Sequence, residues 1–202
     1  SSAASRFTSS MKNMRNAMGL GYIAYAVVAL GIAIVSGFLY EMSIGMFVAW
    51  ILFAAVAALV SEIMVGIAAM HSGWFPGFAT AFVFLIIGML IGFPALPLGI
   101  LVAYTASTGP CFSDMGYDLK TGYILRGNGK DKELELFGRK QQWYAELLGF
   151  AVAFIMMAFF ANNYFGQEMF APVSKTYVST IAAGTTPEIA KWLLIWAVPG
   201  AI

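Results

Sequence analysis

Residues 46–70 read MFVAWILFAAVAALVSEIMVGIAAM, a run of 25 residues in which Glu62 is the single charged side chain. A helix that crosses a membrane needs about 20 mostly apolar residues, because each residue adds about 1.5 Å across a hydrocarbon layer about 30 Å thick. We therefore expect Met46–Met70 to span a lipid bilayer as an α-helix.

Charge stays scarce on both sides of this run. Glu62 is the only charged residue between Met42 and Ser113, and neither Asn16–Tyr40 nor Leu147–Gln167 contains Asp, Glu, Lys or Arg. The chain of 202 residues is 60% hydrophobic and 10% charged, whereas soluble domains carry about 25% charged residues. The alternation typical of membrane β-strands is missing. The sequence predicts an all-α fold, a polytopic transmembrane helical bundle that has the lipid bilayer as a partner.

Composition and motifs also exclude several classes of protein. A water-soluble enzyme of this size could not cover so much apolar surface, and a formal net charge of +1 supplies no basic field for nucleic acid. The sequence contains no GxSxG, GxxxxGK[ST], HExxH or CxxC motif. One cysteine, Cys111, and one histidine, His71, provide neither a disulfide nor the usual number of metal ligands. We expect no enzyme activity, no cofactor, no metal site and no nucleic-acid partner.

Polar and apolar segments divide the chain into four parts. We predict a basic cytoplasmic lead-in over residues 1–18, membrane spans over 19–113, a cytoplasmic loop over 114–142, and further spans with a connecting loop over 143–202. The expected spans are Gly19–Leu39, Met46–Met70 and Trp143–Tyr164, followed by a loop over 165–188 and a last apolar run, Ile189–Ile202, that is short for a span.

Glycine and proline interrupt the apolar sequence over residues 73–113. Phe78–Gly92 is only 15 residues long, and Pro94 and Pro97 precede another apolar piece, Leu98–Ala106. Proline removes a backbone hydrogen bond, and such breaks persist at membrane depth only beside protein or a water-filled cavity. This pattern favours broken or re-entrant helices next to a polar cavity, and two ordinary spans with a proline-kinked join fit it equally well.

The positive-inside rule orients these segments. Residues 6–15 and 120–140 hold most of the basic side chains, so both are expected on the cytoplasmic face. An even number of crossings must then separate them, either two plus a re-entrant hairpin or four. A plasma or inner membrane is the expected location of the multi-pass protein.

Two titratable residues, one inside the second span and one at the break that follows it, are candidates for proton coupling. An ionised acid costs about 2.5–3.5 kcal/mol at the centre of a bilayer, and such acids often mark an ion or proton path. We therefore assign this function to Glu62, with His71 at the helix break as a second candidate. The alternatives are that Glu62 lies near an interface or pairs with a Ser or Tyr, and that His71 is an interfacial or capping group.

The densest polar strip of the chain covers residues 105–123. Asp114 and Asp118, four residues apart, would share one face of a helix. Such a strip at the membrane boundary can hold a cation or steer a substrate amine, or it can be an ordinary helix end with caps and salt bridges. Its candidates for a substrate path are Ser107, Thr108, Asp114, Tyr117, Asp118, Lys120 and Tyr123.

The end of this strip resembles a known family. Asp118–Tyr123 reads DLKTGY, and Gly138–Gln142 reads GRKQQ immediately before an expected span. This combination is similar to the oligopeptide transporter (OPT) superfamily, in particular its bacterial-like, metal-chelate branch. The resemblance implies a secondary transporter that couples proton movement to the uptake of small peptides or metal-chelate complexes.

The size of the chain leaves its completeness open. Four to six spans are too few for the rocking repeats of alternating access, so we expect a fragment from the later half of a transporter. The remaining part of that transporter, or a homo-oligomer, would then complete the substrate path. The alternative is a non-transporting structural or accessory subunit of a larger integral membrane complex.

Overall fold

The structure is a computed structural model, and it describes residues 10–184 together with Glu188, Trp192 and Ile195. The helices are α1 (Met11–Val35), α2 (Phe38–Glu41), α3 (Ile44–Ser72), α4 (Gly77–Ile91), α5 (Ala95–Leu125), α6 (Lys132–Gly166) and α7 (Pro172–Ala183). These described residues contain no strand, so the all-α prediction is confirmed. By length and composition, α1, α3, α5 and α6 can each cross a membrane, and α4 is a shorter apolar helix.

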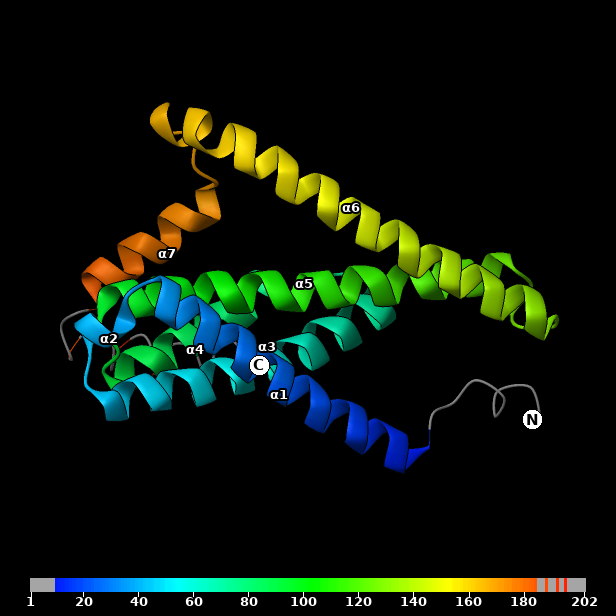
Figure 1. Cartoon of the computed structure of the whole chain (residues 1–202), viewed down its shortest axis with the longest axis horizontal. Coiled ribbons are helices and arrows are strands. Elements are labelled where there is room, and N and C mark those ends of the chain that lie inside the picture. Colours follow the sequence, from blue (N-terminus) through cyan, green and yellow to red (C-terminus); the bar gives the residue numbers. More distant parts are fainter. Residues whose placement is uncertain (1–9, 185–187, 189–191, 193–194, 196–202) are drawn as a thin grey trace.

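Helices α3 and α5 form the centre of the bundle. They make the most extensive contact in the molecule, with α1 and α4 packed against them and α7 returning to α5 (Figure 1). At one end the buried Trp50 indole donates a hydrogen bond from Nε1 to the Pro97 carbonyl at 3.0 Å, and its ring meets Phe38 edge to face at 4.8 Å. Buried alanines along α3 allow the close helix approach that small residues permit in membranes.

The first span has different bounds from the predicted Gly19–Leu39. Helix α1 already begins at Met11, because the Ser10 hydroxyl caps it by accepting from the Asn13 N–H at 3.2 Å. It ends at Val35, and Gly37 then turns the chain at a φ of 76° into the short helix α2. The polar lead-in is thus helical from Met11 onward.

The breaks predicted at the glycines of residues 73–113 are present, and α4 has the expected length of 15 residues, but the piece after it is longer than expected. Gly73 and Gly92 end α3 and α4 in the left-handed conformation, with φ values of 70° and 92°. The prediction that Leu98–Ala106 forms a separate helix was wrong, because α5 runs without interruption from Ala95 to Leu125. Pro97 lies in its first turn, where no partner for a proline N–H is needed, and Pro110 is accommodated inside the helix.

Much of the polar segment 114–142, which was predicted as a cytoplasmic loop, is helical. Helix α5 continues through Leu125, and α6 begins at Lys132 rather than at Trp143. Asp131 caps α6 by accepting from the N–H groups of Glu133 and Leu134 at 3.0 and 3.1 Å. Helices continue beyond an apolar stretch when their polar residues are good helix formers, so only residues 126–131 remain as a turn.

The loop expected over 165–188 also contains a helix. Helix α7 folds back onto the bundle, where its Tyr177 hydroxyl donates to the Phe78 carbonyl at 3.3 Å and the two rings lie 5.3 Å apart. The last apolar run, Ile189–Ile202, lies outside the described residues apart from Trp192 and Ile195.

Candidate functional site

The intramembrane acid joins three helices. The half-buried Glu62 side chain on α3 accepts a hydrogen bond from the hydroxyl of Tyr25 on α1. The hydroxyl of Tyr104 on α5 donates to the backbone carbonyl of Tyr25 at 3.0 Å, and the two tyrosine rings meet edge to face at 6.1 Å. We refer to these three residues as the Tyr25–Glu62–Tyr104 cluster.

The two candidates for proton coupling do not come together. His71 lies nine residues beyond Glu62 on α3, which is about 14 Å along the helix and two and a half turns around it. The exposed imidazole has its Nδ1 at 2.9 Å from the carbonyl of Ile67 in its own helix. Glu62 and His71 therefore face opposite sides of α3.

A second group of polar side chains lies in the core beside Glu62. The buried Ser61 hydroxyl is 3.4 Å from the Thr80 hydroxyl of α4 and also donates to the Thr105 carbonyl of α5 at 3.4 Å. A methyl group at Gly109 would come within 2.5 Å of the same hydroxyl. These contacts satisfy the polar atoms locally and hold α3, α4 and α5 close together.

The substrate-path candidates all lie on α5, and they do not converge on Glu62 as one pocket. Ser107 and Thr108 donate to carbonyls of their own helix, at 3.0 and 3.3 Å. Asp114, Tyr117 and Asp118 are exposed. A surface hollow of about 290 Å³ lies where α5 and α6 begin to diverge, and it is lined by Asp118, Gln142, Ala145, Glu146 and Gly149.

The DLKTGY and GRKQQ residues tie α5 to its neighbours. The Lys120 ammonium donates to the Met70 carbonyl at the carboxyl end of α3, where a cation is favoured. The Gln142 amide donates to the Asp118 carbonyl at 2.7 Å, and the Arg139 guanidinium lies 5.8 Å from the centre of the Tyr123 ring. The two motifs therefore meet in the fold and make contacts between helices.

A group of three charged side chains and one amide overlaps the second motif, and we call Arg126, Glu135, Arg139 and Gln142 the α5–α6 ion-pair cluster. The fully buried Glu135 carboxylate accepts from Arg126 at 2.8 and 3.2 Å and from Arg139 at 2.6 Å. Arg126 also donates to the Gln142 side chain at 2.8 Å. Hydrogen bonding by Glu135 raises the pKa of Arg126, so this guanidinium stays charged. Sequence reasoning missed this cluster.

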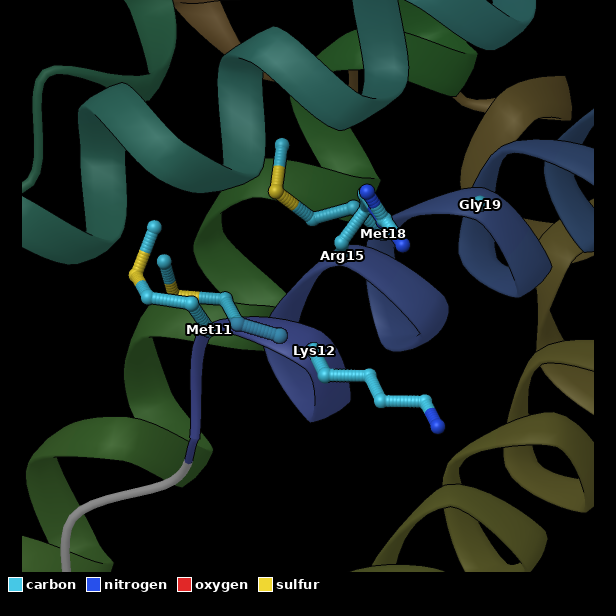
Figure 2. A pocket seen from close by; sticks show the side chains of 6 residues that line it. Met11, Lys12, Arg15, Met18 and Gly19 are labelled. Carbon is cyan, nitrogen blue, oxygen red and sulfur yellow. The ribbon is translucent and has the colours of Figure 1, made fainter.

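The start of α1 projects from the bundle. It borders a hollow of about 700 Å³ lined by Met11, Lys12, Met14, Arg15, Met18 and Gly19. Figure 2 shows the Lys12 side chain pointing away from those of Met11 and Met18, whereas the Arg15 side chain lies beside Met18. Among the described residues, no group of three His, Cys, Asp or Glu side chains is arranged to hold a metal ion.

Four long apolar helices in one bundle, with the half-buried acid Glu62 partway along the second of them, define an integral membrane protein that crosses the bilayer several times. The sequence model of one protein family, described as OPT oligopeptide transporter protein, matches residues 1–202. The chain therefore belongs to the OPT oligopeptide transporter family, as the DLKTGY and GRKQQ motifs predicted. This is a family of transporters and not of enzymes. No curated protein and no solved structure matches the chain.

Proposed function

We propose that the chain belongs to a proton-coupled importer of small peptides or metal-chelate complexes, in which Glu62 takes up and releases the coupled proton. The observation that carries this proposal is the contact of Glu62 with Tyr25 and, through it, with Tyr104. An acid in an apolar span is costly unless its charge is compensated. This acid has a hydroxyl donor aimed at it but no cation bonded to it among the described residues.

This arrangement supports both protonation states of the acid. A hydroxyl can donate to an ionised carboxylate, and it can accept from a protonated one after rotating its own hydrogen. Glu62 therefore keeps a hydrogen-bond partner before and after it binds a proton. A structural salt bridge would instead hold the acid permanently ionised.

His71 remains the second candidate for the coupled proton. Its position at the end of α3, exposed and remote from Glu62, suits exchange of protons with water at the membrane surface. The plasma or inner membrane is the compartment that we propose, with the basic turn 126–131 on the cytoplasmic side.

Among the proposed substrate-path residues, the exposed carboxylates are the better candidates for binding. Asp114 and Asp118 are exposed and lie four residues apart on α5, where they can attract a substrate amine or a complexed cation. Lys120 already bonds the end of α3, and Tyr123 lies against Arg139. These two residues are proposed to position the acidic face rather than to contact substrate.

An accessory, non-transporting subunit is the second candidate function. None of the residues in the most apolar stretch of α6 is buried within the structure. This helix therefore has a large surface for lipid or for other membrane helices. The same surface can receive the remaining part of a transporter or a second copy of the chain. Uptake assays separate these functions, because an accessory subunit alone moves no substrate.

The test uses the full polypeptide that carries this sequence, reconstituted in liposomes with a pH gradient and supplied with small peptides or metal-chelate complexes. Glu62→Gln is expected to abolish pH-driven uptake while protein levels stay unchanged. His71→Asn examines the second candidate, and Glu133→Gln, an exposed acid in the first turn of α6, is the control. Uptake by Glu62→Gln at the parent rate would contradict the proposed role of Glu62.

A further inference from the structure

The group that faces Glu62 comes from a helix that buries little of its apolar surface in the bundle. Only 11% of the residues in the most apolar stretch of α1 are buried, compared with 39% in the corresponding stretches of α3 and α5. Its buried residues are two alanines, Ala29 and Ala33, which lie more than a turn beyond Tyr25. Glu62 and Tyr104 thus supply the polar contacts that place α1 at this level of the bundle.

We propose that Tyr25 is a positioning residue for Glu62, whose hydroxyl sets the pH at which the acid exchanges the transported proton. This inference rests on the proposed role of Glu62 and adds a residue to it. Tyr25 touches no substrate in this scheme. It acts by holding one oxygen of the carboxylate through a hydrogen bond from α1.

The surroundings of Glu62 single out Tyr25 for this role. The Tyr25 hydroxyl of α1 donates to Glu62, and Tyr104 and Cys111 of α5 are the other titratable side chains that interact with it electrostatically. Helix α4 contributes none, because its sequence contains no titratable residue. Tyr25 is the one of these whose hydroxyl hydrogen-bonds the carboxylate.

Tyr104 has a different task in the same cluster. Its hydroxyl proton is used in the 3.0 Å bond to the backbone carbonyl of Tyr25, and its ring lies edge to face against that of Tyr25. Tyr104 therefore holds α1 in position relative to α5, and the position of α1 determines where the Tyr25 hydroxyl points. The cluster links the positions of two helices to the protonation of a residue on a third.

The direction of the effect follows from the chemistry of the bond. A hydroxyl donor stabilises an ionised carboxylate more than a neutral one. Without it, Glu62 would hold its proton up to higher pH. Hydrogen bonds to charged groups are strong enough for a change of about one pH unit.

The test measures uptake against pH in liposomes for the parent, Tyr25→Phe and Glu62→Gln. Tyr25→Phe is expected to keep pH-dependent uptake with its midpoint raised by about one unit. Tyr22→Phe, which removes a hydroxyl from α1 one turn away, is the matched control and should leave the midpoint in place. A midpoint for Tyr25→Phe equal to that of the parent would overturn the positioning role.

Two further measurements keep this result separate from the test of Glu62 itself. If Glu62→Gln removes the pH dependence and Tyr25→Phe changes nothing, only the positioning role fails. If Glu62→Gln behaves as the parent does, the proposed function fails first. Infrared titration of the protonated carboxyl band that Glu62→Gln removes gives the same midpoint without transport, and it should rise in Tyr25→Phe. Tyr104→Phe removes the hydrogen bond to the backbone of α1, and it should raise the midpoint of this titration by a smaller amount.

Discussion

At the scale of single residues, two glycines decide how closely α5 and α6 can meet. A methyl group at Gly138 would lie 2.5–2.9 Å from Arg126 side-chain atoms, and one at Gly122 would collide with Arg126 and Gln142. A flexible side chain could normally move away. Here the guanidinium is held by Glu135 and Gln142, so moving it breaks those bonds.

We therefore predict that Gly138→Ala destabilises the protein by about 1–3 kcal/mol, the usual range for overpacking a filled site. Gly149→Ala is the matched control, because a methyl group there meets nothing within 4 Å. That change should be neutral or stabilising by up to about 1 kcal/mol, since alanine favours a helix. Thermal unfolding in detergent measures both. Equal melting temperatures for the two variants would contradict the assigned role of Gly138.

The candidate residues differ in how far the sequence alone could identify them. Glu62 is conspicuous because nothing else in residues 42–113 is charged. Tyr25 and Tyr104 are two of nine tyrosines, and their contact depends on the relative heights of three helices that lie far apart in the sequence. Only the packed bundle fixes those heights, so a tyrosine partner for Glu62 could be considered from the sequence, but which tyrosine could not be predicted.

At the scale of elements, the turn between α5 and α6 depends on one buried carboxylate. Glu135 is fully buried, whereas the side chains of Arg126 and Arg139 are 16% and 36% exposed. Removing the acid leaves two cations facing each other without a counter-charge. Removing one partner of a fully buried ion pair lowers the free energy of unfolding by about 3–5 kcal/mol. Because solvent screens the partly exposed arginines, the loss is smaller here.

Glu135→Gln is thus expected to lower the free energy of unfolding by about 1–3 kcal/mol. Glu133→Gln, two residues earlier in the same helical turn but exposed, should change it by no more than about 0.5 kcal/mol. Urea or thermal unfolding in micelles compares the two variants. A similar small effect of both would show that the α5–α6 ion-pair cluster does not hold this turn.

The bounds of α5 and α6 show why elements were only partly predictable. Hydropathy marks where a helix leaves the apolar layer, so it identified a span over Trp143–Tyr164 and a polar segment before it. The helix itself continues wherever capping and propensity permit, and Asp131 moves the start of α6 back to Lys132. Whether polar residues beyond a span form a helix or a loop also depends on tertiary contacts, such as the ion pair between Glu135 and Arg126. Hydropathy does not report such contacts.

At the scale of the whole molecule, α4 determines whether the two basic segments of the chain lie on the same side of the membrane. Helices α1, α3, α4 and α5 alternate in direction, and the start of α1 lies toward the same end of the bundle as the turn after α5 (Figure 1). The bond from Lys120 to the Met70 carbonyl places the end of α3 at this end too. With α5 crossing as one continuous helix, the two basic segments share one side only if the 15-residue α4 also crosses the membrane, which gives four crossings between them.

Cysteine labelling from one side of the membrane tests this topology. Cys111 is exposed and must first be replaced by serine. In that background, Lys12→Cys and Lys130→Cys are expected to react with an impermeant maleimide from the cytoplasmic side, and Glu41→Cys, in α2, from the opposite side. If α4 did not cross, Lys12→Cys and Lys130→Cys would be labelled from opposite sides. The short helix would then be re-entrant, and one of the two basic segments would violate the positive-inside rule.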